Sequence, residues 1–99
     1  MVSQKIVIKN FSGLHLRPAG VLCGLAGKYE SDITFDFEDS HDVNAKSILS
    51  VLTACVKKGD EILLKCSGSD EVEALEALVE IIDGGLGEWD SKDMKERKL

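Results

Sequence analysis

A histidine and an arginine lie close together in a short stretch of sequence, GLHLRPA, that covers residues 13–19. Pro18 fits the first turn of a helix, because that turn does not need the backbone N–H that proline lacks. His15 therefore falls at a helix start, where unpaired backbone N–H groups carry a positive partial charge. Arg17 adds a fixed positive charge on a guanidinium whose shape suits phosphate oxygens. The stretch can thus place an anion beside an imidazole nucleophile.

These residue types fit a site that accepts a phosphoryl group and gives it up again. Such a site needs an uncharged imidazole nitrogen as nucleophile, positive groups for the phosphoryl oxygens, and little reorganisation during transfer. The residues alone leave a second interpretation open, in which His15 merely caps the helix and Arg17 is a solvated first-turn residue. The other histidine, His41, lies in a short predicted strand and is expected to be a surface residue.

The spacing of apolar residues predicts the elements around this stretch in the order β-α-β-β-α-β-α. Strands are expected at residues 5–9, 33–37, 41–44 and 61–66, and helices at residues 16–29, 47–56 and 70–83. One amphipathic sheet with three helices predicts a two-layer α+β fold, in which the helices cover one face and solvent covers the other.

Local signals mark the ends of two of these helices. Gly59 suits the left-handed position after the second helix. Ser69 or Asp70 is expected to cap the last helix, and Asp70 with Glu73 forms a capping-box-like pair. The apolar stripe expected on that helix consists of Val72, Leu75, Leu78, Val79 and Ile82.

The composition is that of one small acidic domain. The chain has 99 residues and a formal net charge of −6, which disfavours a broadly basic nucleic-acid binder. No apolar stretch approaches the roughly 18–20 residues of a membrane helix, and the N-terminus lacks the apolar core of a signal peptide. We therefore expect a cytoplasmic protein with no membrane insertion. Residues 1–29 contain four basic and no acidic residues, which is either chance clustering or a patch for an anionic ligand or acidic partner.

The three cysteines, Cys23, Cys55 and Cys66, form no C-x-x-C pair. Each lies among apolar residues, and their number is odd. They are therefore expected to be reduced core residues, with neither a disulfide nor a metal site.

Several segments together resemble the HPr family, the histidine-containing phosphocarrier proteins of the bacterial phosphoenolpyruvate-dependent sugar phosphotransferase system. GLHLRPAG at residues 13–20 is similar to the active-site segment of that family, and NAKSI at residues 44–48 is similar to its second motif. Further similar segments follow in the family's order up to residue 88. The resemblance implies an open-faced β-sandwich, with three helices on a four-stranded antiparallel sheet, formed by residues 1–88. Residues 89–99 would then be a polar C-terminal tail, in which Trp89 is expected to pack on the domain.

The resemblance also implies a function and the residues that carry it. His15 would accept a phosphoryl group from phosphorylated enzyme I and pass it to the IIA component of a sugar permease. Arg17 would neutralise the phosphate and pair with partner carboxylates, while Pro18 would keep the first turn rigid. The protein would be a carrier rather than an enzyme, without a cofactor, and a monomer is expected.

The second motif, NAKSIL at residues 44–49, places Ser47 where a helix N-cap belongs. Some family members carry a regulatory serine at this position, which an HPr kinase/phosphorylase modifies. The added charge would weaken enzyme I binding and create a face for a catabolite-control regulator. The resemblance further implies a partner-binding surface made of Leu16, Gly20, Lys46, Ile48, Leu49 and Leu52. For the helix-two residues, the alternative is a wide core-facing stripe.

The sequence departs from the family pattern at a few positions. Leu16 stands where a small residue is usual, Gly20 replaces a larger residue, and Ser50 replaces a common glycine. The hairpin near residues 38–41 is expected to be one residue longer, and the tail has no family counterpart. These departures keep two alternatives open: a regulatory paralogue that acts mainly as a binding protein through Ser47, and a carrier of the nitrogen branch.

Overall fold

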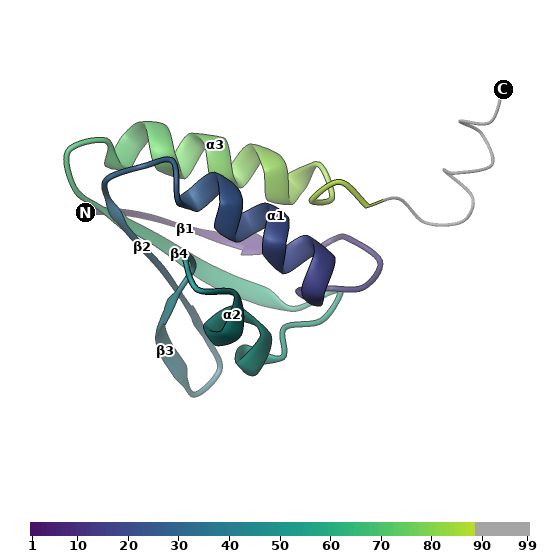
Figure 1. Ribbon diagram of the computed structural model, residues 1–99. Helices are drawn as coiled ribbons and strands as arrows, with labels where there is room; N and C mark the ends of the chain where they lie inside the picture. The colour runs from purple at the N-terminus through teal and green to yellow at the C-terminus, as the bar shows by residue number, and fades with distance from the viewer. Residues whose placement is uncertain (89–99) are drawn as a thin grey trace, which may run out of the picture.

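The computed structural model describes residues 1–88, which form one four-stranded antiparallel sheet and three helices (Figure 1). The expected tail, with Trp89, lies outside the described residues. The elements are β1 (Val2–Val7), α1 (Leu16–Ala26), β2 (Asp32–Phe37), β3 (Ser40–Asn44), α2 (Ile48–Ala54), β4 (Glu61–Ser67) and α3 (Glu71–Asp83). The strands lie in the order β1-β4-β2-β3. The predicted element order and open-faced α+β fold are confirmed.

Alternating side chains give the sheet one apolar face. Along β4, Ile62, Leu64 and Cys66 are buried beneath the helices, while the residues between them lie on the opposite face. The pairing extends this face across neighbouring strands, because Ile6 of β1 lies opposite Ile62 and Phe35 of β2 lies opposite Leu64. The register therefore collects the apolar residues of three strands under the helices.

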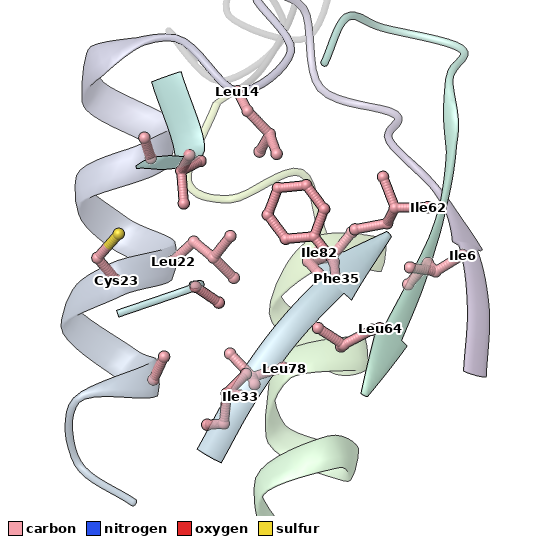
Figure 2. Close-up of a cluster of buried hydrophobic side chains, with 14 of the residues drawn as sticks. Ile6, Leu14, Leu22, Cys23, Ile33, Phe35, Ile62, Leu64, Leu78 and Ile82 are labelled. Atoms are coloured by element: carbon pink, nitrogen blue, oxygen red, sulfur yellow. The ribbon is translucent and has the colours of Figure 1, made fainter. Parts of the chain in front are cut away.

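The core fills the space between that face and the helices (Figure 2). Phe35 is fully buried near the middle of the cluster, and Leu22 of α1 packs into the same cluster. The buried face of α3 consists of Ala74, Leu78 and Ile82, which follow one another at helical spacing. The stripe predicted for α3 was wrong at its start, since Val72 is 54% exposed. Ala74 is the first buried residue of the helix and faces the core instead.

The predicted ends of two helices also need correction. The first helix ends at Ala26 rather than near residue 29. The second ends at Ala54, because Cys55 takes the left-handed conformation and its N–H donates to the Leu52 carbonyl. Gly59 also has a positive φ, of 93°, but it lies in the later turn toward β4. Its N–H donates to the Ile8 carbonyl over 2.7 Å, so it ties that turn to the end of β1.

The start of α3 is held by a contact that differs from the predicted capping box. Asp70 is the N-cap residue, but its carboxylate makes no bond to its own helix. It accepts instead from the Ser31 hydroxyl over 2.5 Å and from the backbone N–H groups of Ser31 and Glu30, each over 2.9 Å. The hydroxyl and the backbone donors lower the pKa of Asp70. The carboxylate thus joins α3 to the start of β2.

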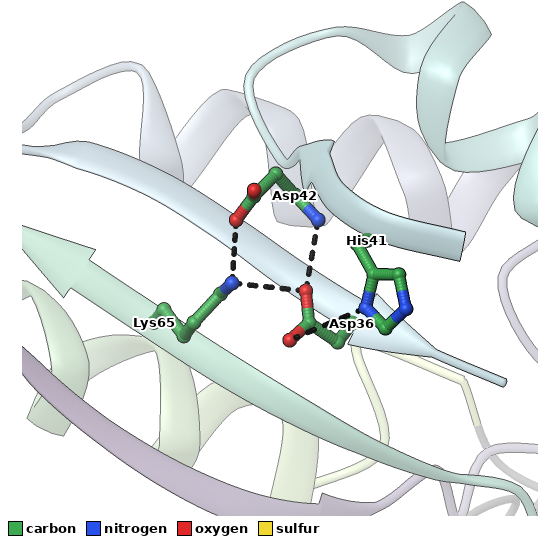
Figure 3. Close-up of polar contacts among 4 residues, drawn as sticks. All are labelled: Asp36, His41, Asp42 and Lys65. Carbon is green, nitrogen blue, oxygen red and sulfur yellow. Dashed lines mark hydrogen bonds and ion pairs between the residues drawn. The ribbon is translucent and has the colours of Figure 1, made fainter. Parts of the chain in front are cut away.

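The open face of the sheet carries a polar network around Lys65 (Figure 3). The Lys65 ammonium lies 2.9 Å from Asp36 Oδ1 and 2.5 Å from Asp42 Oδ1. Asp36 also accepts from the backbone N–H of Asp42 over 2.8 Å, where the β2–β3 register shifts. The Asp42 N–H and the Lys65 ammonium lower the pKa of Asp36. His41 lies beside the network with an exposed side chain, as predicted.

Two of the three cysteines behave as predicted. Cys23 and Cys66 are buried, and burial raises the pKa of both thiols. The prediction was wrong for Cys55, which ends α2 in the left-handed conformation and is exposed. Over residues 1–88, no helix combines the length and the apolar character needed to cross a membrane.

Candidate functional site

The loop before His15 approaches the end of α2 so closely that one position requires glycine. Gly13 has a φ of 65°, and a Cβ placed there would lie 2.6 Å from the Val56 carbonyl oxygen and 2.7 Å from Lys57 Cα. The next residue, Leu14, donates its N–H to the same Val56 oxygen over 2.9 Å and buries its side chain. The backbone just before His15 is therefore fixed against α2.

His15 is the N-cap residue of α1, with an extended backbone. Its carbonyl accepts from the Ala19 N–H over 2.8 Å, which closes the first turn of the helix. Its imidazole makes no capping hydrogen bond and is exposed. His15 thus occupies the cap position without a side-chain cap bond, and the ring is available to solvent at the positive end of a helix.

Arg17 and Pro18 occupy the same first turn with opposite exposure. The Arg17 side chain is exposed, and within residues 1–88 it forms no ion pair. Pro18 is buried, so its ring joins the turn to the core. The turn thus presents a positive side chain from a backbone that is held in place.

Glu88 was missed by sequence reasoning, although it contacts the loop that carries His15. One of its carboxylate oxygens accepts from the Ser12 N–H over 3.0 Å and from the Asn10 amide over 2.9 Å. The Ser12 hydroxyl lies 2.8 Å and 2.7 Å from the two oxygens. Burial alone would raise the pKa of Glu88, but these donors and the nearby Arg17 charge lower it.

A groove beside His15 runs between the start of α1 and the end of α2. Its volume is about 370 Å³, and it is lined by Leu14, His15, Leu16, Leu52, Cys55, Val56 and Lys57. Most of these side chains are apolar, so a partner could bury apolar surface next to the imidazole. Two residues of the predicted partner surface, Leu16 and Leu52, therefore lie together with His15.

The remaining residues of that predicted surface do not line this groove. Leu49 is 75% exposed and lines a second groove of about 520 Å³ between α2 and β3, while Ile48 is 42% exposed. This exposure is inconsistent with a wide core-facing stripe. Gly20 is half-buried on α1. Lys46 has a structural contact, since its ammonium donates to the Tyr29 carbonyl over 2.7 Å.

Ser47 caps α2 as predicted. Its side-chain oxygen accepts from the Ser50 N–H over 3.3 Å, and its carbonyl accepts from the Val51 N–H over 3.0 Å.

Within residues 1–88, no group of three or more His, Cys, Asp or Glu side chains is arranged to hold a metal ion.

The family model described as "PTS HPr component phosphorylation site" matches residues 2–83. The chain belongs to the HPr family. It is 38% identical over 88 residues to the phosphocarrier protein HPr of Neisseria meningitidis, covering 89% of this chain and 98% of that protein. It is 40% identical over 78 residues to the HPr-like protein Crh of Bacillus subtilis, covering 79% of this chain and 91% of that protein. The crystal structure of HPr-C-His from Thermoanaerobacter tengcongensis has a TM-score of 0.85 and 40% identity, covering 91% of this chain and 100% of that one.

HPr proteins are phosphocarriers of the phosphotransferase system and work with its other proteins as carriers rather than catalysts. The family resemblance drawn from residues 13–20 and 44–48 is therefore confirmed, and so is the carrier class that it implied. The acceptor residue, the named partners, the monomeric state and the domain boundary at residue 88 stay predictions.

Proposed function

We propose that the chain carries a phosphoryl group on His15, which it takes from phosphorylated enzyme I and passes to the IIA component of a sugar permease. The observation that carries this proposal is the exposed His15 imidazole at the start of α1, without a capping bond. An imidazole held in this way keeps a ring nitrogen free to attack phosphorus.

The first turn of α1 offers the groups that such a transfer needs. During transfer, the bond between phosphorus and enzyme I would break as a bond from phosphorus to the imidazole nitrogen forms. The phosphoryl oxygens carry negative charge and would need positive neighbours. The N–H groups of Leu16 and Arg17 begin the helix. The exposed Arg17 guanidinium, which forms no ion pair within residues 1–88, could pair with those oxygens. Pro18 keeps the turn rigid, which limits reorganisation when the group leaves again.

Docking would use the groove beside His15. Leu16 and Leu52 supply apolar surface there, and Lys57 supplies a positive charge at the rim. An acidic partner surface with an apolar centre would fit this groove by both shape and charge.

Regulation at Ser47 is a further part of the proposal. A phosphate on its hydroxyl would lie at the N-terminus of α2, where the helix dipole favours negative charge. We expect an HPr kinase/phosphorylase to modify it and a catabolite-control regulator to bind the modified form. The similarity to the HPr-like protein Crh favours a second candidate function, in which the chain acts mainly as a regulatory binding protein.

Phosphorylation with enzyme I and phosphoenolpyruvate tests the carrier function. We expect a single acid-labile, base-stable phosphate, located on His15 by mass spectrometry. His15→Ala should abolish this phosphorylation. His41→Ala changes the other histidine, which lies on the open face of the sheet, and should leave the phosphorylation unchanged. A His15→Ala protein that still accepts phosphate would refute the carrier function, and a wild type that accepts none would favour the regulatory one.

A further inference from the structure

The loop between β1 and His15 is held from outside at three places besides Glu88, one of which is the ion pair between the Lys9 ammonium and Asp83 over 2.6 Å. At its start, the Ile8 N–H donates to the Asp60 carbonyl over 2.8 Å. At its end, the Leu14 N–H donates to the Val56 carbonyl. Between these points, within residues 1–88, the hydrogen bonds from Ser12 to other parts of the chain all go to Glu88. The Glu88 carboxylate therefore holds the loop at Ser12, between its two ends.

Asn10 extends this support into the loop itself. Its side chain is only 3% exposed, and its amide nitrogen donates both to Glu88 and to the Gly13 carbonyl, over 2.9 and 2.7 Å. The Gly13 N–H in turn donates to the Asn10 carbonyl over 3.2 Å. One amide thus links the carboxylate to the glycine that lies two residues before His15, while its own oxygen is buried and has no hydrogen-bond partner among residues 1–88.

We infer that Glu88 is a positioning residue for phosphoryl transfer at His15, because its side-chain carboxylate fixes the preceding loop through Ser12 and Asn10. The inference rests on the proposed role of His15. The carboxylate is well suited to this task, since both of its oxygens accept and the Ser12 N–H, the Ser12 hydroxyl and the Asn10 amide all donate to it. A misplacement of the imidazole by an ångström is enough to slow transfer by orders of magnitude.

Glu88→Ala is the sharpest test, because it removes both acceptor oxygens, whereas glutamine would keep an acceptor for Asn10 and Ser12 and could donate to the Ser12 hydroxyl. We expect the maximal rate of phosphorylation by enzyme I to fall about tenfold, with KM changed less than about twofold. Glu76→Ala is the matched control: Glu76 is exposed on α3 and contributes no side-chain hydrogen bond or ion pair within residues 1–88. It removes the same charge and should leave both parameters unchanged.

Two further measurements separate positioning from a general loss of stability. Hydrogen exchange of the Ser12 and Leu14 amides should accelerate in Glu88→Ala at temperatures where the protein stays folded, and a double-mutant cycle with Ser12→Ala should be non-additive. Transfer rates and amide exchange that stay at the wild-type values in Glu88→Ala would overturn the inference, as would a change in KM alone. If the inference on Glu88 fails in this way, phosphorylation of the wild type on His15 still supports the proposed function. Phosphate uptake by His15→Ala would overturn both the proposed function and the inference on Glu88.

Discussion

Replacing Gly13 with alanine tests whether the close approach of the loop to α2 fixes the site. Alanine would have to adopt a φ of 65°, which costs an L-residue roughly 1–2 kcal/mol. Its Cβ would also lie 2.6 Å from the Val56 carbonyl oxygen, an atom of the backbone that cannot rotate away. Overpacking of this kind costs about 1–3 kcal/mol. We therefore expect Gly13→Ala to lower the free energy of unfolding by roughly 2–5 kcal/mol.

Gly24→Ala supplies the matched control for this substitution. Gly24 lies within α1, and a Cβ placed there would meet nothing within 4 Å. Alanine is a better helix residue than glycine by about 0.8–1.0 kcal/mol, so this variant should be more stable than the wild type. The same chemical change is thus expected to have opposite signs at the two positions.

Thermal unfolding followed by far-ultraviolet circular dichroism measures both changes. In a domain of this size each kcal/mol moves Tm by roughly 4–8 °C, so Tm should fall by at least about 8 °C in Gly13→Ala and rise by about 4 °C in Gly24→Ala. Transfer to His15, measured below the unfolding transition, should slow only in Gly13→Ala. Equal Tm values for Gly13→Ala and the wild type would show that the loop can move away from α2, and the account of the site would be refuted.

Substitutions at Ser47 and Asp70 probe the polar contacts at helix starts. Ser47→Ala should lower the free energy of unfolding by about 1 kcal/mol through the lost cap, while Ser47→Asp should keep the cap. In a titration with enzyme I, Ser47→Asp should bind more weakly, and added salt should reduce the difference; equal affinities would leave Ser47 as a cap alone. The lowered pKa values of Asp70 and Glu88 predict stability that is constant above about pH 5 and falls at lower pH, as each folded-state carboxylate is protonated. Tm measured against pH should show this fall, and Asp70→Asn should reduce it.

The elements and the position of His15 could be predicted because their signals are local in sequence. The apolar–polar alternation in residues 33–37 predicted β2. The preference of proline for the first turn of a helix placed the start of α1 correctly at Leu16. The C-terminal end of α2 could not be predicted in this way. Cys55 ends the helix in a left-handed conformation, which its residue type disfavours. Gly59, four residues later, is the residue type that usually takes this conformation after a helix, so the sequence favoured a later end.

The parts of the site that escaped sequence reasoning are contacts between distant segments. Glu88 meets Ser12 across 76 positions and Asn10 across 78, and no periodicity links residues so far apart. Asp70 shows the same limit, because its sequence context indicated a local capping box. The fold instead offered it the buried Ser31, which lies 39 positions away, and the tertiary contact prevailed.

The charge around His15 also depends on the fold rather than on the segment that contains it. Residues 1–29 carry no acid, but acids from the end of the described chain are brought to them. Asp83 lies 2.6 Å from the Lys9 ammonium, and the charge of Arg17 acts on Glu88. The broad basic patch suggested by the sequence is therefore partly neutralised. Arg17 keeps an exposed charge in the first turn of α1, two residues after His15, so we expect an anionic group to be attracted to this turn more than to the whole N-terminal surface.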